Sequence, residues 1–307
     1  YSPLIRGFFC TFDEIFTLLK NISIIWLPIL FYFCGIELVV LFTKPSLFLD
    51  LNFFFFFLLF LIIFLAFLFL KNKISSKIFY LAEGITIYAL MTFLYKETAV
   101  LNTLIFPKVD GFLSHLDHKI FGFQPSVRFS ETFDSWYFSE LFYFGYFSYY
   151  LLPLAAFLII YLKIPQKIEE FSFILITSFL LYYFTFILIP AEGPQFYFPF
   201  PENTIEAKGI FGNMVKLIQK NGEVPTAAFP SSHVGISWIV IFWLYQNFRK
   251  SVKYFIPFVV LLMFSTVYIK AHYFVDVVAG FISAPIVFFL TFKFYKFLNH
   301  KLDVRFN

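Results

Sequence analysis

Long, continuous runs of apolar residues dominate this chain, and short polar segments separate them. Most runs are close to the roughly 20 residues that a helix needs to cross a bilayer. They do not alternate residue by residue, which favours helices over an outer-membrane barrel. The pattern predicts an all-α polytopic membrane protein with about eight transmembrane helices. These fall near residues 22–42, 51–70, 79–104, 138–162, 171–189, 234–248, 254–270 and 274–293.

The composition is that of a chain lying mainly in lipid. Hydrophobic residues make up 60% and charged residues 14%, whereas a soluble domain carries about a quarter charged residues. The net charge of +4 is modest. Basic residues at helix ends are ordinary in membrane proteins, so no nucleic-acid partner is expected. Cys10 and Cys34 form neither a disulfide framework nor a metal motif.

Lysine and arginine set the expected orientation. If both ends of the chain lie in the cytoplasm, the inside loops are short and dense in these residues, as the positive-inside rule requires. Two long segments, 105–137 and 190–233, then lie outside. Residues 107–128 predict an interfacial helix followed by a loop on the outer face. The 190–233 segment predicts a lid or a headgroup-binding surface, because long loops in compact domains are often functional.

Two short motifs carry most of the chemistry. Pro230-Ser231-Ser232-His233 comes directly before a predicted span, and His272 stands four residues before Asp276. The apolar stretch between the motifs, residues 234–269, predicts a helical hairpin. A hairpin returns its two ends to the same side of a membrane. We therefore expect His233 and His272 to meet at the outer surface.

Each motif has a chemical and a structural interpretation. On a helix, His272 and Asp276 share a face, so the carboxylate can fix the histidine tautomer and leave the other ring nitrogen free to attack. A structural His–Asp pair is the alternative. A serine-capped helix start binds anions, and His233 could there protonate a leaving oxygen. An ordinary capped helix with a bystander histidine is the alternative. The two motifs together favour phosphoryl chemistry on a lipid.

The motifs resemble signatures of the type 2 phosphatidic acid phosphatase (PAP2) superfamily, in its inositol phosphorylceramide synthase-like branch. The second family signature is P-S-G-H, and Ser232 replaces its glycine. The third is S-R-x5-H-x3-D, which Ser265 to Asp276 match except for Thr266 in place of arginine. The first, K-x6-R-P, is absent, and Pro190–Gln195 stands in its place. The outer-face segment also resembles this branch, through Asp110, Asp117, Gly122 and Pro125.

Carried over position by position, the resemblance implies a role for each site residue. His272 is the nucleophile that forms a phosphohistidine, and Asp276 orients it. His233 protonates the leaving alcohol and then helps to deprotonate the acceptor. Neighbouring backbone amides help to hold the phosphate oxygens. The side chains expected to do so are Ser231, Ser232, Lys270 and Gln195. No metal or other cofactor is implied.

The resemblance also implies a domain plan. A six-helix PAP2-type core covers roughly residues 79–293, after an N-terminal region, 1–78, with two added transmembrane helices. Residues 294–307 form a basic cytoplasmic tail. The Phe-rich, Lys-containing composition is typical of an AT-rich genome. It predicts a bacterial inner membrane, with the active site on the periplasmic face.

The predicted function is that of a lipid phosphatase or phosphotransferase acting on a membrane lipid. A phosphomonoester carries about two negative charges and a diester one, so loss of the first signature's cations favours a diester donor, although lysines of the 190–233 segment could contribute. A transferase resembling inositol phosphorylceramide synthase is the leading alternative. A non-catalytic transporter or lipid-binding protein with a decayed site is an alternative of another class.

Overall fold

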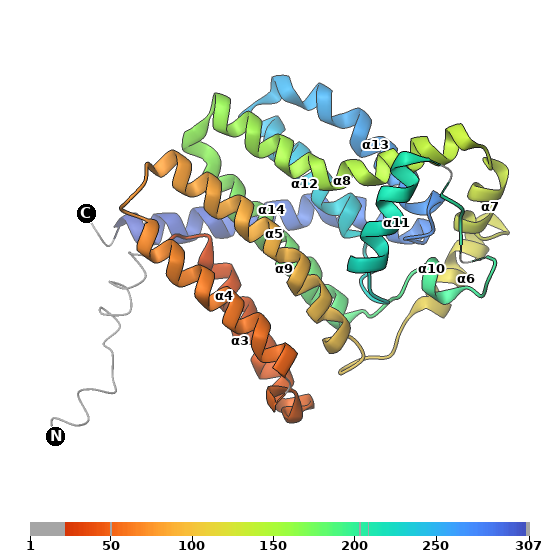
Figure 1. Cartoon of the computed structure of the whole chain (residues 1–307), viewed down its shortest axis with the longest axis horizontal. Coiled ribbons are helices and arrows are strands. Elements are labelled where there is room, and N and C mark those ends of the chain that lie inside the picture. Colours follow the sequence, from red (N-terminus) through yellow and green to blue (C-terminus); the bar gives the residue numbers. More distant parts are fainter. Residues whose placement is uncertain (1–21, 50, 203, 208, 305–307) are drawn as a thin grey trace.

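The computed structural model describes residues 22–49, 51–202, 204–207 and 209–304, and within these ranges the chain is helical without β-strands. Figure 1 shows a bundle of long helices with short helices gathered at one end. The α-helices are α3 (Trp26–Thr43), α4 (Leu51–Leu70), α5 (Ser76–Leu101), α6 (Asp110–Phe121), α7 (Pro125–Thr132), α8 (Trp136–Lys163), α9 (Ile168–Leu188), α10 (Pro194–Tyr197), α11 (Ile210–Gly222), α12 (Ser232–Asn247), α13 (Val252–Tyr268) and α14 (Phe274–Val304). Three 3-10 helices accompany them, η1 (Pro45–Leu49), η2 (Pro165–Lys167) and η3 (Arg249–Ser251).

The prediction of an all-α polytopic membrane protein is confirmed. Six helical segments in the described part of the chain are long and apolar enough to cross a membrane. They are α3, α5, α8, α9 with η2, α13 with η3, and α14. The two remaining predicted spans are helices as well. In α4 the described apolar stretch is Phe55–Leu70, and α12 has 16 residues.

Helix α12 is surrounded by other helices of the predicted core. It packs against α14, α13, α8 and α9, and α5 packs against α9. The close approach depends on Gly235 of α12, because a Cβ atom there would collide with the ring and hydroxyl of Tyr182. The Tyr182 hydroxyl in turn lies 2.9 Å from Oγ of Ser283. Helices α9, α12 and α14 are therefore joined at a point that has no room for a larger residue.

The two N-terminal helices lie on one side of this core (Figure 1). Helix α3 packs against α9, and α4 packs against α5. Trp26 Nε1 donates a hydrogen bond to Oε1 of the buried Glu83 on α5, at 2.8 Å. Phe33 and Phe60 pack edge to face between α3 and α4, with ring centroids 5.2 Å apart. A buried carboxyl group of α5 thus accepts a hydrogen bond from a side chain of α3.

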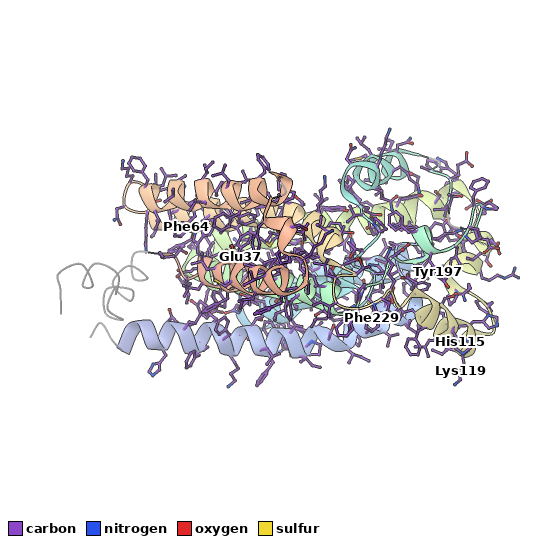
Figure 2. All side chains as sticks on the ribbon, turned by 90° about the horizontal axis from the view of Figure 1, so that it is seen from below. Glu37, Phe64, His115, Lys119, Tyr197 and Phe229 are labelled. Atoms are coloured by element: carbon purple, nitrogen blue, oxygen red, sulfur yellow. The ribbon has the colours of Figure 1, made fainter. Side chains whose placement is uncertain are left out.

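Short helices cover the end of the bundle where α12 begins and α13 ends (Figure 1). Figure 2 places His115 and Lys119 of α6 and Tyr197 of α10 at this end, far from Phe64 of α4. The predicted interfacial helix is α6. The segment expected to follow it as a loop contains a second helix, α7, because Pro125 takes the first helical position, where proline is favoured.

Helix α14 continues beyond the predicted end of the last span, through residues 294–304. Figure 2 shows it as a long, straight helix along one edge of the molecule. The extension contains good helix formers and neither glycine nor proline. Lys296 Nζ lies 5.3 Å from the ring centroid of Phe292, one turn earlier. The segment expected as a basic tail is therefore helical as far as the structure describes it.

Candidate active site

The structure brings His233 and His272 into direct contact. His233 lies in the first turn of α12, and His272 lies in the turn between α13 and α14. His233 Nδ1 and His272 Nε2 are 3.1 Å apart. The rings meet edge to face, with centroids 5.2 Å apart. The α12–α13 hairpin therefore does what the sequence predicts, and it joins two imidazoles at one end of the bundle.

The second ring nitrogen of His272 is held by the protein. His272 Nδ1 lies 2.8 Å from the carbonyl oxygen of Ala228 and 3.5 Å from Oδ2 of Asp276. A carbonyl oxygen can only accept, so Nδ1 carries the proton and Nε2 has a free lone pair. Burial lowers the pKa of His272 to about 4. The imidazole is therefore neutral at ordinary pH, with its unprotonated nitrogen turned towards His233.

Asp276 lies behind His272 and organises the backbone around it. Its Oδ2 atom accepts a hydrogen bond from the amide of Tyr273, at 2.8 Å, and its carbonyl oxygen accepts one from the amide of Ser231, at 3.0 Å. The carboxylate is fully buried. Within the described residues, its Oδ1 atom has no hydrogen-bond partner. Asp276 thus links the two histidine motifs and places a carboxylate beside Nδ1 of His272.

The serine motif forms the start of α12. Ser231 Oγ accepts a hydrogen bond from the amide of Val234 at 3.4 Å, so this side chain caps the helix. Gly280 of α14 lies against Ser231, and a Cβ atom there would collide with the Ser231 carbonyl group. Ser232 lines a cavity together with His233. Both predicted serines are therefore adjacent to the histidine pair, and their contact with phosphate stays a prediction.

Lys270 and Gln195 contact the 190–233 segment. Lys270 Nζ donates to the carbonyl oxygens of Glu202, at 2.5 Å, and Thr204, at 2.8 Å. Gln195 Nε2 donates to Oε2 of Glu223, at 2.6 Å. The Gln195 amide also donates to the carbonyl oxygen of Lys270, at 2.9 Å. The two residues lie close to each other along the chain that leads to His272, and their role in phosphate binding stays a prediction.

The arginine of the third family signature has no counterpart in this chain. Thr266, at the position of the signature's arginine, donates its hydroxyl proton to the carbonyl oxygen of Met263 at 2.9 Å. Burial lowers the pKa of Lys270 and of Lys216 on α11. Among the described residues, no group of three or more His, Cys, Asp or Glu side chains could hold a metal ion.

Two aspartates of α6 hold the backbone on both sides of His272. Asp117 accepts hydrogen bonds from the amides of Phe274, at 2.8 Å, and Val275, at 3.0 Å, and so caps α14. Asp110 accepts from the amides of Glu192, at 2.9 Å, and Gly193, at 2.9 Å. Burial raises the pKa of Asp117. Both aspartates belong to the outer-face segment that resembles the synthase-like branch, and their carboxylate oxygens accept hydrogen bonds from backbone amides.

Sequence reasoning missed the groups that surround His233. The rings of Tyr146 and Tyr149 pack against its imidazole, with centroids 4.9 Å and 4.3 Å away. Glu223, at the end of α11, accepts a hydrogen bond from the Tyr146 hydroxyl at 2.7 Å. The sequence could have revealed the tyrosines, because the spacing of Tyr146, Tyr149 and Tyr150 places all three on one face of α8. Glu223 lies in a loop segment and carries no such signal.

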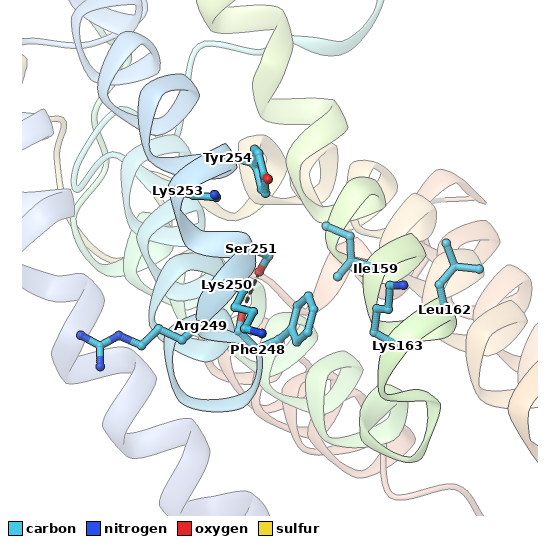
Figure 3. Close-up of a pocket in the computed structure, with 9 residues that line it drawn as sticks. All are labelled: Ile159, Leu162, Lys163, Phe248, Arg249, Lys250, Ser251, Lys253 and Tyr254. Carbon is cyan, nitrogen blue, oxygen red and sulfur yellow. Dashed lines mark hydrogen bonds between the residues drawn. The ribbon is translucent and has the colours of Figure 1, made fainter.

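A separate cavity of about 470 Å³ lies far from the histidines. Figure 3 shows it between the C-terminal end of α8 and the turn that joins α12 to α13. Its lining includes four cations, Lys163, Arg249, Lys250 and Lys253. Helix α12 runs between this end and His233, so the basic cavity and the histidine pair occupy opposite ends of that helix. This is the arrangement that the positive-inside pattern predicts.

Comparison with known proteins agrees with this geometry. Over 76 residues, the chain is 36% identical to the inositol phosphorylceramide synthase catalytic subunit AUR1 of Saccharomyces cerevisiae. This segment covers 25% of the chain and 19% of that relative, so the chain matches about a fifth of its length. No solved structure matches the chain. The family model of the PAP2 superfamily matches residues 112–290, which hold both histidine motifs and make up more than half of the sequence. The chain therefore belongs to the PAP2 superfamily.

Proposed function

We propose that the chain is a membrane-embedded enzyme that transfers a phosphorus-containing group of a lipid through a phosphohistidine on His272. The 3.1 Å contact between His233 Nδ1 and His272 Nε2 carries this proposal. His272 is neutral, and its unprotonated Nε2 atom can attack phosphorus. His233 lies within hydrogen-bond distance of that atom, where it can act as an acid or a base. A nucleophile and an acid–base group within hydrogen-bond reach are the usual basis of covalent catalysis.

The reaction proceeds in two half-reactions. Burial and the neighbouring His272 lower the pKa of His233 in the free enzyme, and the negative charge of a bound phosphate favours its protonated form. In the first half-reaction, His272 Nε2 attacks phosphorus, the bond between phosphorus and the leaving alcohol breaks, and the protonated His233 gives its proton to the leaving oxygen. In the second, the acceptor hydroxyl attacks phosphorus, the phosphorus–nitrogen bond breaks, and His233 takes the acceptor's proton. Water or a lipid alcohol serves as the acceptor. The enzyme returns to its starting state without an external oxidant or reductant.

Asp276 and Ala228 stabilise the charge that develops on His272. When Nε2 forms a bond to phosphorus, the imidazole becomes positive while Nδ1 keeps its proton. The Ala228 carbonyl oxygen at 2.8 Å and the Asp276 carboxylate at 3.5 Å both face that N–H group. A buried carboxylate behind a reacting histidine has this function in hydrolytic triads. We assign the orienting role to both groups, with the carbonyl oxygen as the nearer acceptor.

The loss of the signature cations favours a phosphodiester donor. A monoester brings about two negative charges and a diester brings one. Thr266 occupies the arginine position, and Lys270 donates two hydrogen bonds to carbonyl oxygens of Glu202 and Thr204. We therefore propose transfer of a phosphoalcohol headgroup from a phospholipid to a lipid alcohol. The similarity to an inositol phosphorylceramide synthase subunit supports this type of reaction.

A cavity beside His233 provides a route for the lipid. It has a volume of about 290 Å³, and its lining includes Ser232 and His233. Ala89 and Thr92 of α5 and Leu154 of α8 also line it, and these residues are exposed on the outside of the bundle. The cavity thus opens sideways, where a bilayer surrounds the helices. We propose that the lipid enters here, on the outer side that the distribution of basic residues favours, and that the composition of the chain points to a bacterial inner membrane.

The experiment that tests this function measures two products. Purified protein and the His272→Ala variant are incubated with ceramide and a panel of donors: phosphatidate, undecaprenyl pyrophosphate, phosphatidylinositol, phosphatidylethanolamine and phosphatidylcholine. Free phosphate and new phospholipids are then followed by mass spectrometry. A new headgroup-bearing lipid without free phosphate supports transfer, and free phosphate that disappears in the variant supports hydrolysis. Neither product, or equal activity of the variant, would contradict the proposed enzyme and favour a non-catalytic protein.

A further inference from the structure

Tyrosine is the most frequent residue type among those that line the cavity beside His233. Its six tyrosines come from three helices that are distant in sequence. They are Tyr88 and Tyr95 of α5, Tyr146, Tyr149 and Tyr150 of α8, and Tyr183 of α9. Glu223, Ser232 and His233 belong to the same lining. A group bound among the tyrosines therefore lies next to the histidine that we propose as the acid and base.

Several of these tyrosines already use their hydroxyl protons within the protein. The Tyr146 hydroxyl donates to Oε1 of Glu223 at 2.7 Å. The Tyr183 hydroxyl donates to the carbonyl oxygen of Met91 at 3.0 Å, and that of Tyr88 to the carbonyl oxygen of Tyr150 at 3.4 Å. What these residues offer a ligand is therefore chiefly the surface of their aromatic rings. Ring faces carry negative partial charge.

Apart from His233, which the proposed mechanism protonates, the charge carried by the described lining residues is negative. Glu223 contributes a carboxyl group, and the described lining residues include neither lysine nor arginine. Three side chains fix this carboxyl group as an acceptor. They are Tyr146, Gln195 at 2.6 Å and Gln219 at 3.1 Å. Aromatic rings together with a carboxylate attract cations, and such cages recognise quaternary ammonium ligands in particular. An additional anion, in contrast, would be repelled.

We propose that the tyrosine cavity binds the headgroup of the donor phospholipid, and that this headgroup carries an ammonium group. The inference rests on the proposed function, because it names the substrate class of the same site. The donor phosphate lies at the histidine pair, and the ammonium group lies among the tyrosine rings and Glu223. A zwitterionic headgroup has both charges that this arrangement requires, a negative one at the histidine pair and a positive one among the tyrosines and Glu223. A polyol headgroup lacks the positive charge that aromatic ring faces and a carboxylate attract.

The chemical step remains the one described above, with the headgroup moving together with the phosphate. The bond between phosphorus and the diacylglycerol oxygen breaks, a bond between phosphorus and His272 Nε2 forms, and His233 protonates the departing diacylglycerol. The headgroup ester bond stays intact. The ammonium group therefore stays in the cavity while the first product leaves and the acceptor alcohol enters.

The proposal is tested with a panel of donors. Purified protein receives ceramide as acceptor and, in separate reactions, phosphatidylethanolamine, phosphatidylcholine, phosphatidylinositol or phosphatidylglycerol as donor. We expect kcat/KM for the ammonium lipids to exceed that for the other two by at least about tenfold. Preference for phosphatidylinositol or phosphatidylglycerol would overturn the ammonium headgroup while leaving the transferase intact. Absence of transfer from every donor would overturn the proposed function itself.

Two variants of Tyr95 show whether the ligand contacts the aromatic ring or the hydroxyl group of this residue. Tyr95→Phe keeps the aromatic face, and Tyr95→Leu removes it. We expect Tyr95→Phe to stay within about twofold of the wild type and Tyr95→Leu to raise KM for the ammonium lipids about tenfold. Glu223→Gln keeps the size of the side chain, and we expect it to reduce the preference for ammonium lipids. Equal losses in Tyr95→Phe and Tyr95→Leu would overturn the aromatic cage.

Discussion

His233 Nδ1 and His272 Nε2 lie 3.1 Å apart, although 39 residues separate the two histidines. The carbonyl oxygen of Ala228 holds the proton of His272 on Nδ1, so the His272 atom that faces His233 is the free nitrogen. The contact therefore has a direction, with His233 as the donor and His272 as the acceptor. This arrangement suits a nucleophile with an acid–base partner, and it leads to distinct predictions for the two histidines.

The first prediction concerns His233. The change His233→Gln should lower kcat by roughly 10²–10⁴-fold with lipid donors, because proton transfer to the leaving oxygen is lost. The loss should be much smaller with a p-nitrophenyl ester, whose leaving group departs without a proton. Steady-state rates with both kinds of donor measure this difference. His115→Gln, on the exposed face of α6, is the matched control and should keep full activity. Equal losses with both donors would contradict the acid–base role.

The second prediction concerns pH. Burial lowers the pKa of His272 to about 4, from an ordinary value of 6.5. The free enzyme should therefore keep its nucleophile neutral as the pH falls below 6, and kcat/KM should have an acidic limb controlled by His272 near pH 4. Between pH 4 and pH 6.5, His272 binds more protons in the unfolded chain than in the folded protein. The free energy of unfolding should therefore decline as the pH falls from 6.5 towards 4. The His233→Gln variant isolates His272, because residue 233 no longer titrates. If its activity falls with a midpoint near pH 6.5, His272 has an ordinary pKa, which would contradict a buried, neutral nucleophile.

The third prediction concerns the packing of α14 against the serine motif. Gly280→Ala places a Cβ atom against the carbonyl group of Ser231, and backbone cannot move aside easily. Overpacking of this kind costs about 1–3 kcal/mol. We expect a lower Tm in detergent and a lower kcat. Gly35→Ala in α3 is the control, because an added Cβ there meets no atom within 4 Å. A Gly280→Ala protein as stable and active as the control would show that this contact is unimportant.

The fourth prediction concerns the capping of α14. Asp117→Ala removes the acceptor of the Phe274 and Val275 amides next to His272. The loss of a helix cap costs about 0.5–2 kcal/mol. Activity should fall together with thermal stability, because the same amides fix the turn that holds His272. Lys119→Ala, an exposed position on the same helix, should change neither quantity. Full activity of Asp117→Ala would show that the contact between α6 and the start of α14 is not needed for activity.

The fifth prediction concerns topology. In a protein whose native cysteines are replaced by serine, Met214→Cys on α11 should react with an impermeant thiol reagent added from outside. Lys250→Cys, in the basic cavity at the other end of α12, should react only after the membrane is permeabilised. The reverse pattern of labelling would place the histidine pair on the cytoplasmic side.

Much of the fold and of the site could be predicted because it depends on local patterns. Apolar runs mark the helices, and the hairpin between the motifs brings His233 and His272 together. The acceptor on Nδ1 of His272 could not be predicted, because Ala228 contributes only a carbonyl oxygen, whose position depends on the path of a loop. Glu223 was missed for a similar reason. Its neighbours Tyr146 and Gln195 come from other parts of the chain.

The most direct test of the account is detection of phosphohistidine. The protein is mixed with a donor phospholipid labelled at phosphorus, without acceptor, and is quenched in alkali, where a phosphorus–nitrogen bond survives. We expect label on the protein, mapped by mass spectrometry to His272, absent from His272→Ala and released when acceptor is added before the quench. Turnover without label on His272, or label on another residue, would contradict the central claim.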